Sequence, residues 1–404
     1  MRHTISAFAF LVALTAATPA IAGPLDPVEI AEGVELDPIL DVRLRYETAD
    51  QDAVFADNAE SITIRTRAGA KISTNGFSLL AEAEGTVALE NDFNDTIPQN
   101  GIEPFPVIAD PNSFQLNRLQ VGYNADGFGV TLGRQRIILD DARFVGNVGW
   151  RQNEQTFDAV RGTAKFGPVK LDATYAIQQN TIFGSRSPND NFDGDFIFLN
   201  AGADFGVVKG AVYHYNIDYD RRIGASSAST GIYATASVPA GPLKLNGRLE
   251  FATQSDTGAN PVDYSADFFK AEAGAAIAGF GLKLGYEELG SDDGIQAFQT
   301  PLATAHKFNG FADLFLVTPA TGLQDRYVTL SKSFKVPALP GLRAFVTYHD
   351  FNSDFGSIDY GTEWDAVVTF KVGPVGLLAK YGDYNANGFG VDTQRFTLQA
   401  GISF

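Results

Sequence analysis

Hydrophobic residues recur at every second position along most of the chain. In residues 394–404 the side chains of Phe396, Leu398, Ala400, Ile402 and Phe404 fall on one side of an extended strand, and the residues between them are polar or Gly. The same alternation recurs in segments spread over the sequence, namely 40–46, 62–72, 77–89, 169–177, 243–251, 282–286, 342–348 and 375–381. A period of two predicts β-strands with one apolar face.

The connections between these segments alternate in length. Eight short turns rich in Gly, Asn and Pro separate nine longer polar stretches, of which 290–324 is the longest, and seventeen connections imply eighteen strands. We therefore expect an all-β chain that forms a transmembrane antiparallel β-barrel of about 18 strands, with short periplasmic turns and long extracellular loops. A soluble sandwich of this length would be expected to divide into domains, and no linker marks a boundary.

The amino terminus predicts export. A basic residue, Arg2, precedes an apolar run over 5–17 and the cleavage pattern Ala20-Ile21-Ala22, and the run is shorter than the roughly 20 residues that span a bilayer. We expect a cleaved signal peptide over 1–22, a periplasmic segment over 23–38 and the barrel over 39–404, located in the bacterial outer membrane. The carboxy-terminal Phe404 resembles the assembly signal of outer-membrane barrels, so we expect contact with the barrel-assembly machinery, membrane lipid and lipopolysaccharide.

Charge is distributed unevenly along the pattern. The chain has 30 Lys and Arg against 48 Asp and Glu, a net charge of -18, which does not suit a nucleic-acid partner. Acids lie mainly in the long stretches, whereas basic residues dominate the polar faces of the strands. Because a charge facing lipid at mid-bilayer costs roughly 2–4 kcal/mol, we assign these basic residues to the lumen. Those we single out as pore-lining are Arg43, Arg45, Arg65, Arg67, Arg118 and Arg343.

Three functions remain open for such a barrel. A cationic lumen lowers the electrostatic barrier for anions, and planar Arg side chains bind carboxylates in a fork geometry, which favours a passive channel for anionic or sugar-acid solutes. Facing Arg and Glu side chains would equally keep the wall of an unselective diffusion porin solvated. A non-conducting receptor or adhesion barrel, whose loops bind a partner, is the third possibility.

Some segments carry a family resemblance. Gly133-Arg134-Gln135, Trp150-Arg151-Gln152 and the segment 157–162 (FDAVRG) resemble the alginate export family of outer-membrane barrels, and so does the stretch 299–325. The resemblance implies eighteen strands and an Arg-rich conduit for an acidic polysaccharide such as alginate. It implies that Arg134 and Arg161 line the conduit, with Arg151 nearer the mouth. Arg134 and Arg136, both candidate pore-lining residues, share strand parity with apolar neighbours, which a β-bulge near Gly133 or a position at the membrane interface would reconcile.

The longest polar stretch contains a candidate constriction. Residues 303–316 predict a short amphipathic helix, and the stretch either folds inward to narrow the pore or forms an extracellular cap. Within it, His306, Lys307 and Asp313 are the residues expected to act in a constriction. We predict no enzymatic activity, because His214, His306 and His349 have no Ser or Asp at a recognisable catalytic spacing. The sequence indicates no metal site with nameable ligands and no cofactor.

Overall fold

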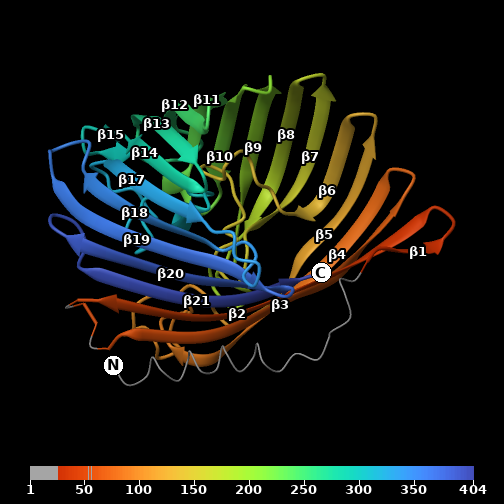
Figure 1. Ribbon diagram of the computed structural model, residues 1–404, viewed down its shortest axis with the longest axis horizontal. Coiled ribbons are helices and arrows are strands. Elements are labelled where there is room, and N and C mark those ends of the chain that lie inside the picture. Colours follow the sequence, from red (N-terminus) through yellow and green to blue (C-terminus); the bar gives the residue numbers. More distant parts are fainter. Residues whose placement is uncertain (1–25, 53, 56) are drawn as a thin grey trace.

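The computed structural model describes residues 26–52, 54, 55 and 57–404, so the predicted signal peptide lies outside the described residues. Eighteen strands of this described part form the wall of one barrel (Figure 1). In chain order they are β2 (Val34–Gln51), β3 (Ala59–Thr74), β4 (Phe77–Asp92), β5 (Ser113–Ala125), β6 (Phe128–Gln135), β7 (Thr156–Phe166), β8 (Val169–Asn180), β9 (Asn191–Asp204), β10 (Val208–Tyr219), β11 (Ser227–Ala240), β12 (Leu243–Asp256), β13 (Ser265–Ile277), β14 (Phe280–Leu289), β17 (Leu323–Ser333), β18 (Arg343–Asn352), β19 (Asp359–Val372), β20 (Val375–Ala386) and β21 (Thr393–Ser403).

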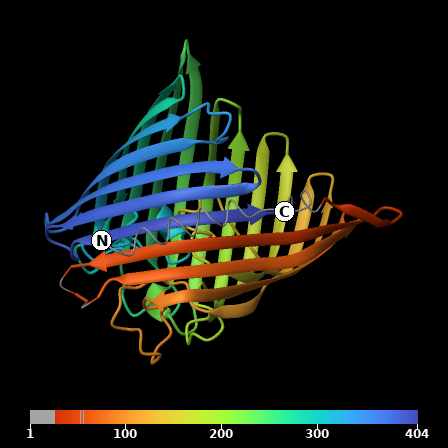
Figure 2. The same ribbon diagram turned by 60° about the horizontal axis from the view of Figure 1, so that its bottom comes forward.

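The barrel closes between its last and first wall strands. Each wall strand pairs antiparallel with the next along the chain, and β21 pairs with β2 from Asp41 opposite Ser403 to Gln51 opposite Thr393. Two further hydrogen bonds join Leu40 and Phe404 beyond this register. Figure 2 shows β21 and β2 side by side along the seam. Closure leaves no free edge in the wall, which is the condition for strands to cross lipid. The expected antiparallel barrel of 18 strands is confirmed.

The two ends of the barrel differ in the length of their connections, as the sequence predicted. Thr74 pairs with Phe77, and the two residues between them, Asn75 and Gly76, both have positive φ (48° and 83°). This is the tight hairpin for which an Asn-Gly pair is suited. At this end a short strand, β1 (Val28–Ala31), pairs with the start of β2. β2 itself begins at Val34, so barrel pairing starts before residue 39.

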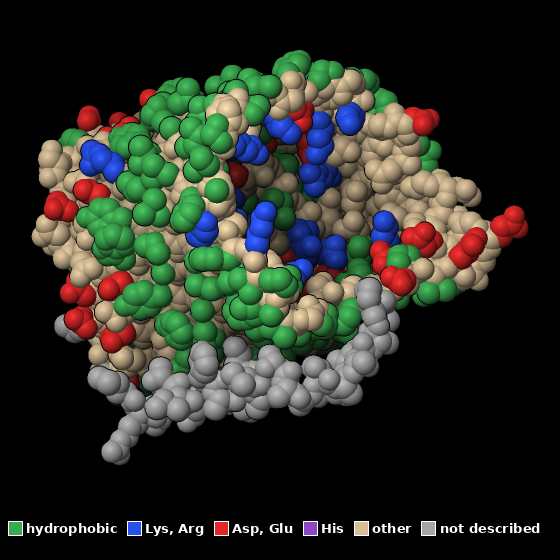
Figure 3. All heavy atoms as spheres, viewed as in Figure 1, with side chains coloured by type: hydrophobic (Ala, Val, Ile, Leu, Met, Phe, Trp, Pro, Cys, Tyr) green, Lys and Arg blue, Asp and Glu red, His purple; other side chains and the backbone are tan. Residues whose placement is uncertain are grey.

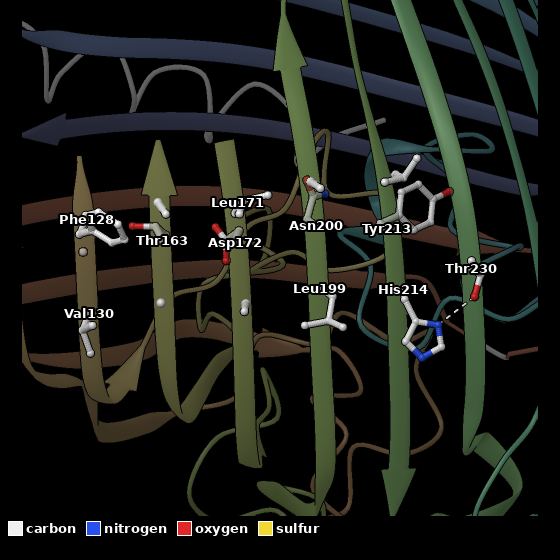
Figure 4. A pocket seen from close by; sticks show the side chains of 16 residues that line it. Phe128, Val130, Thr163, Leu171, Asp172, Leu199, Asn200, Tyr213, His214 and Thr230 are labelled. Carbon is white, nitrogen blue, oxygen red and sulfur yellow. Dashed lines mark hydrogen bonds between the residues drawn. The ribbon is translucent and has the colours of Figure 1, made fainter. Parts of the chain in front are cut away.

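Side chains alternate between the two faces of the wall. On β5 and β6 the apolar side chains Leu119, Val121, Val130 and Leu132 are exposed, whereas charged side chains of β2 to β4 are buried inside. The outer surface over β6 to β11 forms a shallow apolar groove lined by Phe128, Val130 and Leu199 among others (Figure 4). The alternation thus separates an apolar membrane-facing surface from a polar lumen.

The remaining elements lie in the long connections. They are β15 (Ser291–Asp292), β16 (Gln296–Ala297) and two short 3-10 turns, η1 (Ile223–Ala225) and η2 (Ala305–Lys307). No helix among the described residues is long and apolar enough to span a membrane. The prediction of an amphipathic helix over 303–316 is wrong. Positive φ at Asn309, Gly310 and Asp313 interrupts any helix there, and η2 is all that forms.

Candidate functional site

Three long connections enter the barrel and meet inside it: loop 93–112, loop 136–155 and loop 290–322. Loop 136–155 inserts Phe144 into an aromatic cluster, where its ring lies 5.3 Å from that of Tyr213, 5.2 Å from Phe268 and 5.7 Å from Phe298. Phe144, Tyr213, Phe268 and Phe298 are all buried. The apolar core of the molecule therefore lies between the loops and the inner wall, and its packing holds the loops in place.

The tip of loop 136–155 rests on the basic face of β2. Arg43 Nη1 donates hydrogen bonds to the carbonyl oxygens of Gly149, Trp150 and Arg151 at 3.1–3.2 Å. The Arg45 guanidinium lies 4.2 Å from the centre of the Trp150 ring. The inward-facing Arg side chains of β2 thus capture the backbone of a loop, which satisfies carbonyl groups that would otherwise be buried without donors.

Loop 290–322 is held by carboxylates on the inner face of β14, β17 and β19. Glu363 Oε1 on β19 accepts a hydrogen bond of 2.7 Å from the Ala312 N–H, and Asn309 Nδ2 donates to Glu287 Oε1 and Asp325 Oδ2 at 3.1 Å. Both His306 and Asn309 are buried. Of the two arrangements open for this loop, an inward fold or an extracellular cap, the structure places its central residues inside the barrel.

Most of the arginines predicted to line the pore already bind carboxylates of the chain. Arg118 pairs with Glu82 at 2.7 Å and Arg161 pairs with Asp172 at 2.6 Å, both on the inner face. Pairs of the same kind join Arg45 with Asp110, Arg65 with Asp41, Arg67 with Glu84, and Arg136 with Glu154. Such pairs leave these arginines with less capacity to bind a passing anion than the sequence pattern indicated.

Arg134 and Arg136 do not lie on the inner strand face. The pairing of β6 continues through Gly133, whose φ is 113°, and no register shift falls there. Arg134 therefore keeps the outward parity of Leu132 and pairs with Asp158 at 2.7 Å. Arg136 follows the end of β6 at Gln135 and belongs to loop 136–155. Of the two explanations open for their parity, the bulge near Gly133 is absent from β6.

A cavity of about 1230 Å³ occupies the lumen beside these loops. Its wall comes from β10 to β14, from β17 to β20 and from the tips of loop 136–155 and loop 290–322. Seven Lys and Arg residues line it against five Asp and Glu residues, so the lining is net cationic although the chain carries -18. Figure 3 shows Lys and Arg side chains gathered in the hollow of the barrel. The lining cations are Lys209, Arg248, Lys270, Lys283, Lys307, Arg343 and Lys380.

Three of these cations have no carboxylate within 4.0 Å among the residues that the structure describes. Lys307 donates to the Asp141 carbonyl oxygen at 2.6 Å, and Lys380 lies 2.6 Å from His306 Nε2. Arg343 is exposed at the start of β18. Aromatic rings accompany the first two: Lys307 Nζ lies 5.2 Å from the centre of the Phe308 ring, and Lys380 Nζ lies 3.3 Å from that of Phe311. The cavity therefore offers unpaired positive charge next to flat apolar surfaces.

Loop 136–155 and loop 290–322 carry perturbed ionisable groups. Burial opposes the charge on Arg151, but Glu47, Asp110 and Asp313 outweigh it and raise the pKa of Arg151. Burial lowers the pKa of His306 to about 4. Arg151 is therefore a fixed cation at the loop junction, whereas His306 is neutral near pH 7.

Several residues of the loop junction were not predicted from the sequence to belong to the site. Asp110 accepts a 2.7 Å hydrogen bond from the Gln152 N–H, and Glu154 accepts from Asn147 and Arg136. Arg143 lies 2.9 Å from Glu287 across the lumen. Asp110 and Glu154 belong to long polar stretches, which were expected to form extracellular loops rather than a junction inside the barrel. Asp110, Arg143 and Glu154 lie in long stretches that also carry apolar or aromatic residues, such as 137–150. This mixture was the signal in the sequence that these stretches are buried.

The model of the Gram-negative porin family matches residues 7–316 of the sequence, which is more than half of the chain. The chain belongs to the Gram-negative porin family. This membership and the closed barrel place the porin in the bacterial outer membrane. The family and the fold are those of channels rather than enzymes. A comparison with curated proteins gives no match.

Solved structures share the fold of this porin at low sequence identity. OccK9 (OpdG) of Pseudomonas aeruginosa has a TM-score of 0.71 and 17% identity, and OccAB4 of Acinetobacter baumannii has 0.71 and 16%. OpdK of Pseudomonas aeruginosa, solved with vanillate, has 0.70 and 15%. Each comparison covers 91% of this chain and 98% of the other. The resemblance to the alginate export family was therefore wrong, because the family match and these neighbours indicate a porin instead. The stretches that carried the resemblance cover only a small part of the chain, whereas the porin match covers residues 7–316.

Proposed function

We propose that this porin is a passive channel with a preference for small anionic solutes, including sugar acids and planar carboxylates. The net cationic lining of the 1230 Å³ cavity carries the proposal, because unpaired cations lower the electrostatic barrier for anions. Lys307 and Arg343, which are exposed in the cavity, supply cations that a passing anion can reach. The vanillate in the similar OpdK structure, itself a planar carboxylate, agrees with this class of solute.

The size of the solute follows from the loops. Loop 136–155 and loop 290–322 meet across the lumen, where Trp150 and His306 stack at 4.3 Å. A lumen crossed in this way leaves a cavity suited to a small molecule. Entry from outside passes acidic loops, so the preference for anions arises from the cavity rather than from the mouth.

An unselective diffusion porin is the second candidate, and the ion pairing of the predicted arginines supports it. Arg118 with Glu82 and Arg161 with Asp172 form neutral pairs that solvate the wall without favouring either sign of ion. The two candidate functions differ in ion selectivity. A current carried mainly by anions indicates that the unpaired cations dominate, and a current without preference indicates that the neutral pairs do.

Recordings from planar bilayers under a KCl gradient separate the candidates. A unit charge about 4 Å from an ion contributes roughly 1 kcal/mol even in water, so Lys307→Ala with Arg343→Ala should lower the anion-to-cation permeability ratio several-fold. The matched control is Arg161→Ala with Asp172→Ala, which removes a neutral pair and should leave the ratio nearly unchanged. A wild-type ratio near one, unaffected by either double variant, would support the unselective porin. A folded barrel without any current would instead support a receptor or adhesion barrel.

A further inference from the structure

The two loops that cross the lumen are joined by backbone hydrogen bonds, from the Gly146 N–H to the Leu302 oxygen and from the Thr304 N–H to the Ala142 oxygen. Beyond these bonds, their tips meet through two stacked rings. The rings of Trp150 and His306 lie 4.3 Å apart with an interplanar angle of 11°. The ring of Phe311 stacks with that of His306 as well, with centres 5.6 Å apart and an angle of 23°. His306 therefore connects the tip of loop 136–155 with the tip of loop 290–322, which are 156 residues apart in sequence.

The two ring nitrogens of His306 contact an acidic and a basic side chain, respectively. Nδ1 lies 2.5 Å from Asp313 Oδ1, and Nε2 lies 2.6 Å from Lys380 Nζ on β20. An ionised carboxylate only accepts hydrogen bonds and an ammonium group only donates them. The geometry therefore assigns the proton to Nδ1 and leaves Nε2 as the acceptor, which is a neutral imidazole in one tautomer.

The side chains of Arg45 and Lys380 lie against the faces of the Trp150 ring. Lys380 Nζ lies 4.0 Å from the ring centre and the Arg45 guanidinium lies 4.2 Å from it. The indole N–H of Trp150 is buried and has no hydrogen-bond partner among the described residues. Because ring contacts rather than hydrogen bonds hold the side chain of Trp150, a change in the charge of the stacked ring acts directly on the position of the indole ring.

We propose that the stacked side chains of Trp150 and His306 form a gate between the loop tips and that His306 is the positioning residue that keeps this gate closed while it is neutral. The proposal rests on the channel function proposed above. A proton added at Nε2 would remove the hydrogen bond from Lys380 and place two cations 2.6 Å apart. It would also set an imidazolium beside Arg45 and Lys380 around the same indole ring. The two rings then part while the backbone hydrogen bonds between the loops remain, and the passage at the loop tips widens.

The charges around His306 determine the direction of the pH response. Asp313 lies on its own loop, Lys380 on β20 and Arg151 on loop 136–155, and Arg45 and Glu47 on β2 face Lys380. Burial lowers the pKa of His306 to about 4, whereas an imidazole released into water has a pKa of about 6.5. The closed gate thus binds fewer protons than the open gate between these values. It is most stable above pH 6.5 and loses stability as the pH falls toward 4.

Single-channel recordings from pH 8 to pH 4 test the gate. In the wild type the ratio of open to closed states should rise by up to about ten-fold per pH unit below 6.5. His306→Phe keeps a ring for the stack but has no titrating nitrogen, so its response should be flat in this range. Trp150→Ala should conduct more at every pH. The control is Trp364→Ala, because Trp364 lies exposed on β19 beside Tyr348, away from the lumen.

Fluorescence provides a readout that does not depend on current. The chain has two tryptophans, so Trp364→Phe leaves Trp150 as the reporter of the junction. Its emission should shift to longer wavelength as the pH falls from 6.5 to 4, and His306→Phe in the same background should abolish the shift. Equal pH responses of the wild type and His306→Phe in both measurements would overturn the proposal. A shift in a channel without anion preference would refute the proposed selectivity and leave the gate intact.

Discussion

Arg151 Nη2 lies 3.0 Å from Glu47 Oε1, and this pair fastens the tip of loop 136–155 to strand β2. The side chains of both residues are at most 6% exposed. Arg151 also lies 3.5 Å from Asp110 of loop 93–112 and 3.5 Å from Asp313 of loop 290–322. One guanidinium therefore holds all three inward loops together and against the wall.

We expect Arg151→Ala to loosen this junction strongly. Removal of one partner of a buried ion pair leaves an uncompensated charge and costs roughly 3–5 kcal/mol. Three carboxylates would lose a common cation, so the loops should fluctuate and the current should become noisy. Limited proteolysis of the loops and single-channel noise measure the effect. The matched control is Arg326→Ala, since Arg326 and Asp350 form a half-exposed pair at 3.9 Å, of a class worth roughly 0–1 kcal/mol. Equal noise in the two variants would contradict the role of Arg151.

A second prediction concerns the close approach of loop 290–322 to β20. A Cβ at Gly382 would lie 3.0 Å from Phe311 Cβ and 3.1 Å from the Ala312 nitrogen. Gly382→Val should therefore displace the loop tip, break the hydrogen bond between Ala312 and Glu363, and change the conductance while the barrel still folds. Gly376→Val on the same strand is the control, because its Cβ would meet only the Gly401 oxygen at 3.8 Å. An unchanged conductance in Gly382→Val would show that the loop does not limit the passage.

Acid should weaken the anchorage of loop 136–155 through Glu154. Burial disfavours the charge on this carboxylate, but Arg67 and Arg136 outweigh burial and lower the pKa to about 2 from 4.5. The folded state therefore holds fewer protons than the unfolded state between these values. The stabilisation is fully present above pH 4.5 and is lost as the pH falls toward 2. Thermal unfolding across this range should show the decline, and Glu154→Gln should lower stability at pH 7 and flatten the curve.

Removal of Phe404 should impair assembly of the barrel. The Phe404 N–H donates to the Leu40 carbonyl oxygen at 2.8 Å, and its oxygen accepts from Leu40 at 3.4 Å, so this residue makes the last contacts of the seam between β21 and β2. We expect a smaller folded fraction in outer membranes, measured by the different mobility of folded and heated barrels on gels. Deletion of Asn100, in an exposed part of loop 93–112, serves as the control for a one-residue deletion.

The wall of the barrel could be predicted because its signal is local. The alternation of Phe396, Leu398 and their neighbours reports the faces of one strand, and the Asn75-Gly76 pair reports a hairpin, without reference to any distant residue. The inner arginines Arg45, Arg65 and Arg67 were placed in the lumen by the same parity. The ion pair of Arg45 with Asp110 could not be predicted, since Asp110 lies on a long connection 65 residues away. The pairs of Arg65 with Asp41 and of Arg67 with Glu84 join neighbouring strands, and the strand register brings them together.

The amino-acid sequence by itself determined an exported, eighteen-stranded antiparallel barrel, because strand period, turn composition and the cost of charge in lipid act over a few residues. Only the tertiary structure decided which charges remain available to a solute. Loop 136–155 and loop 290–322 bring Arg151 to Glu47 and His306 to Lys380 across the lumen, and such contacts depend on how the long connections fold inside a closed wall. Burial and pairing then leave Lys307, Lys380 and Arg343 as the cations without a carboxylate partner in the described part of the cavity, a distinction that residue type alone does not carry.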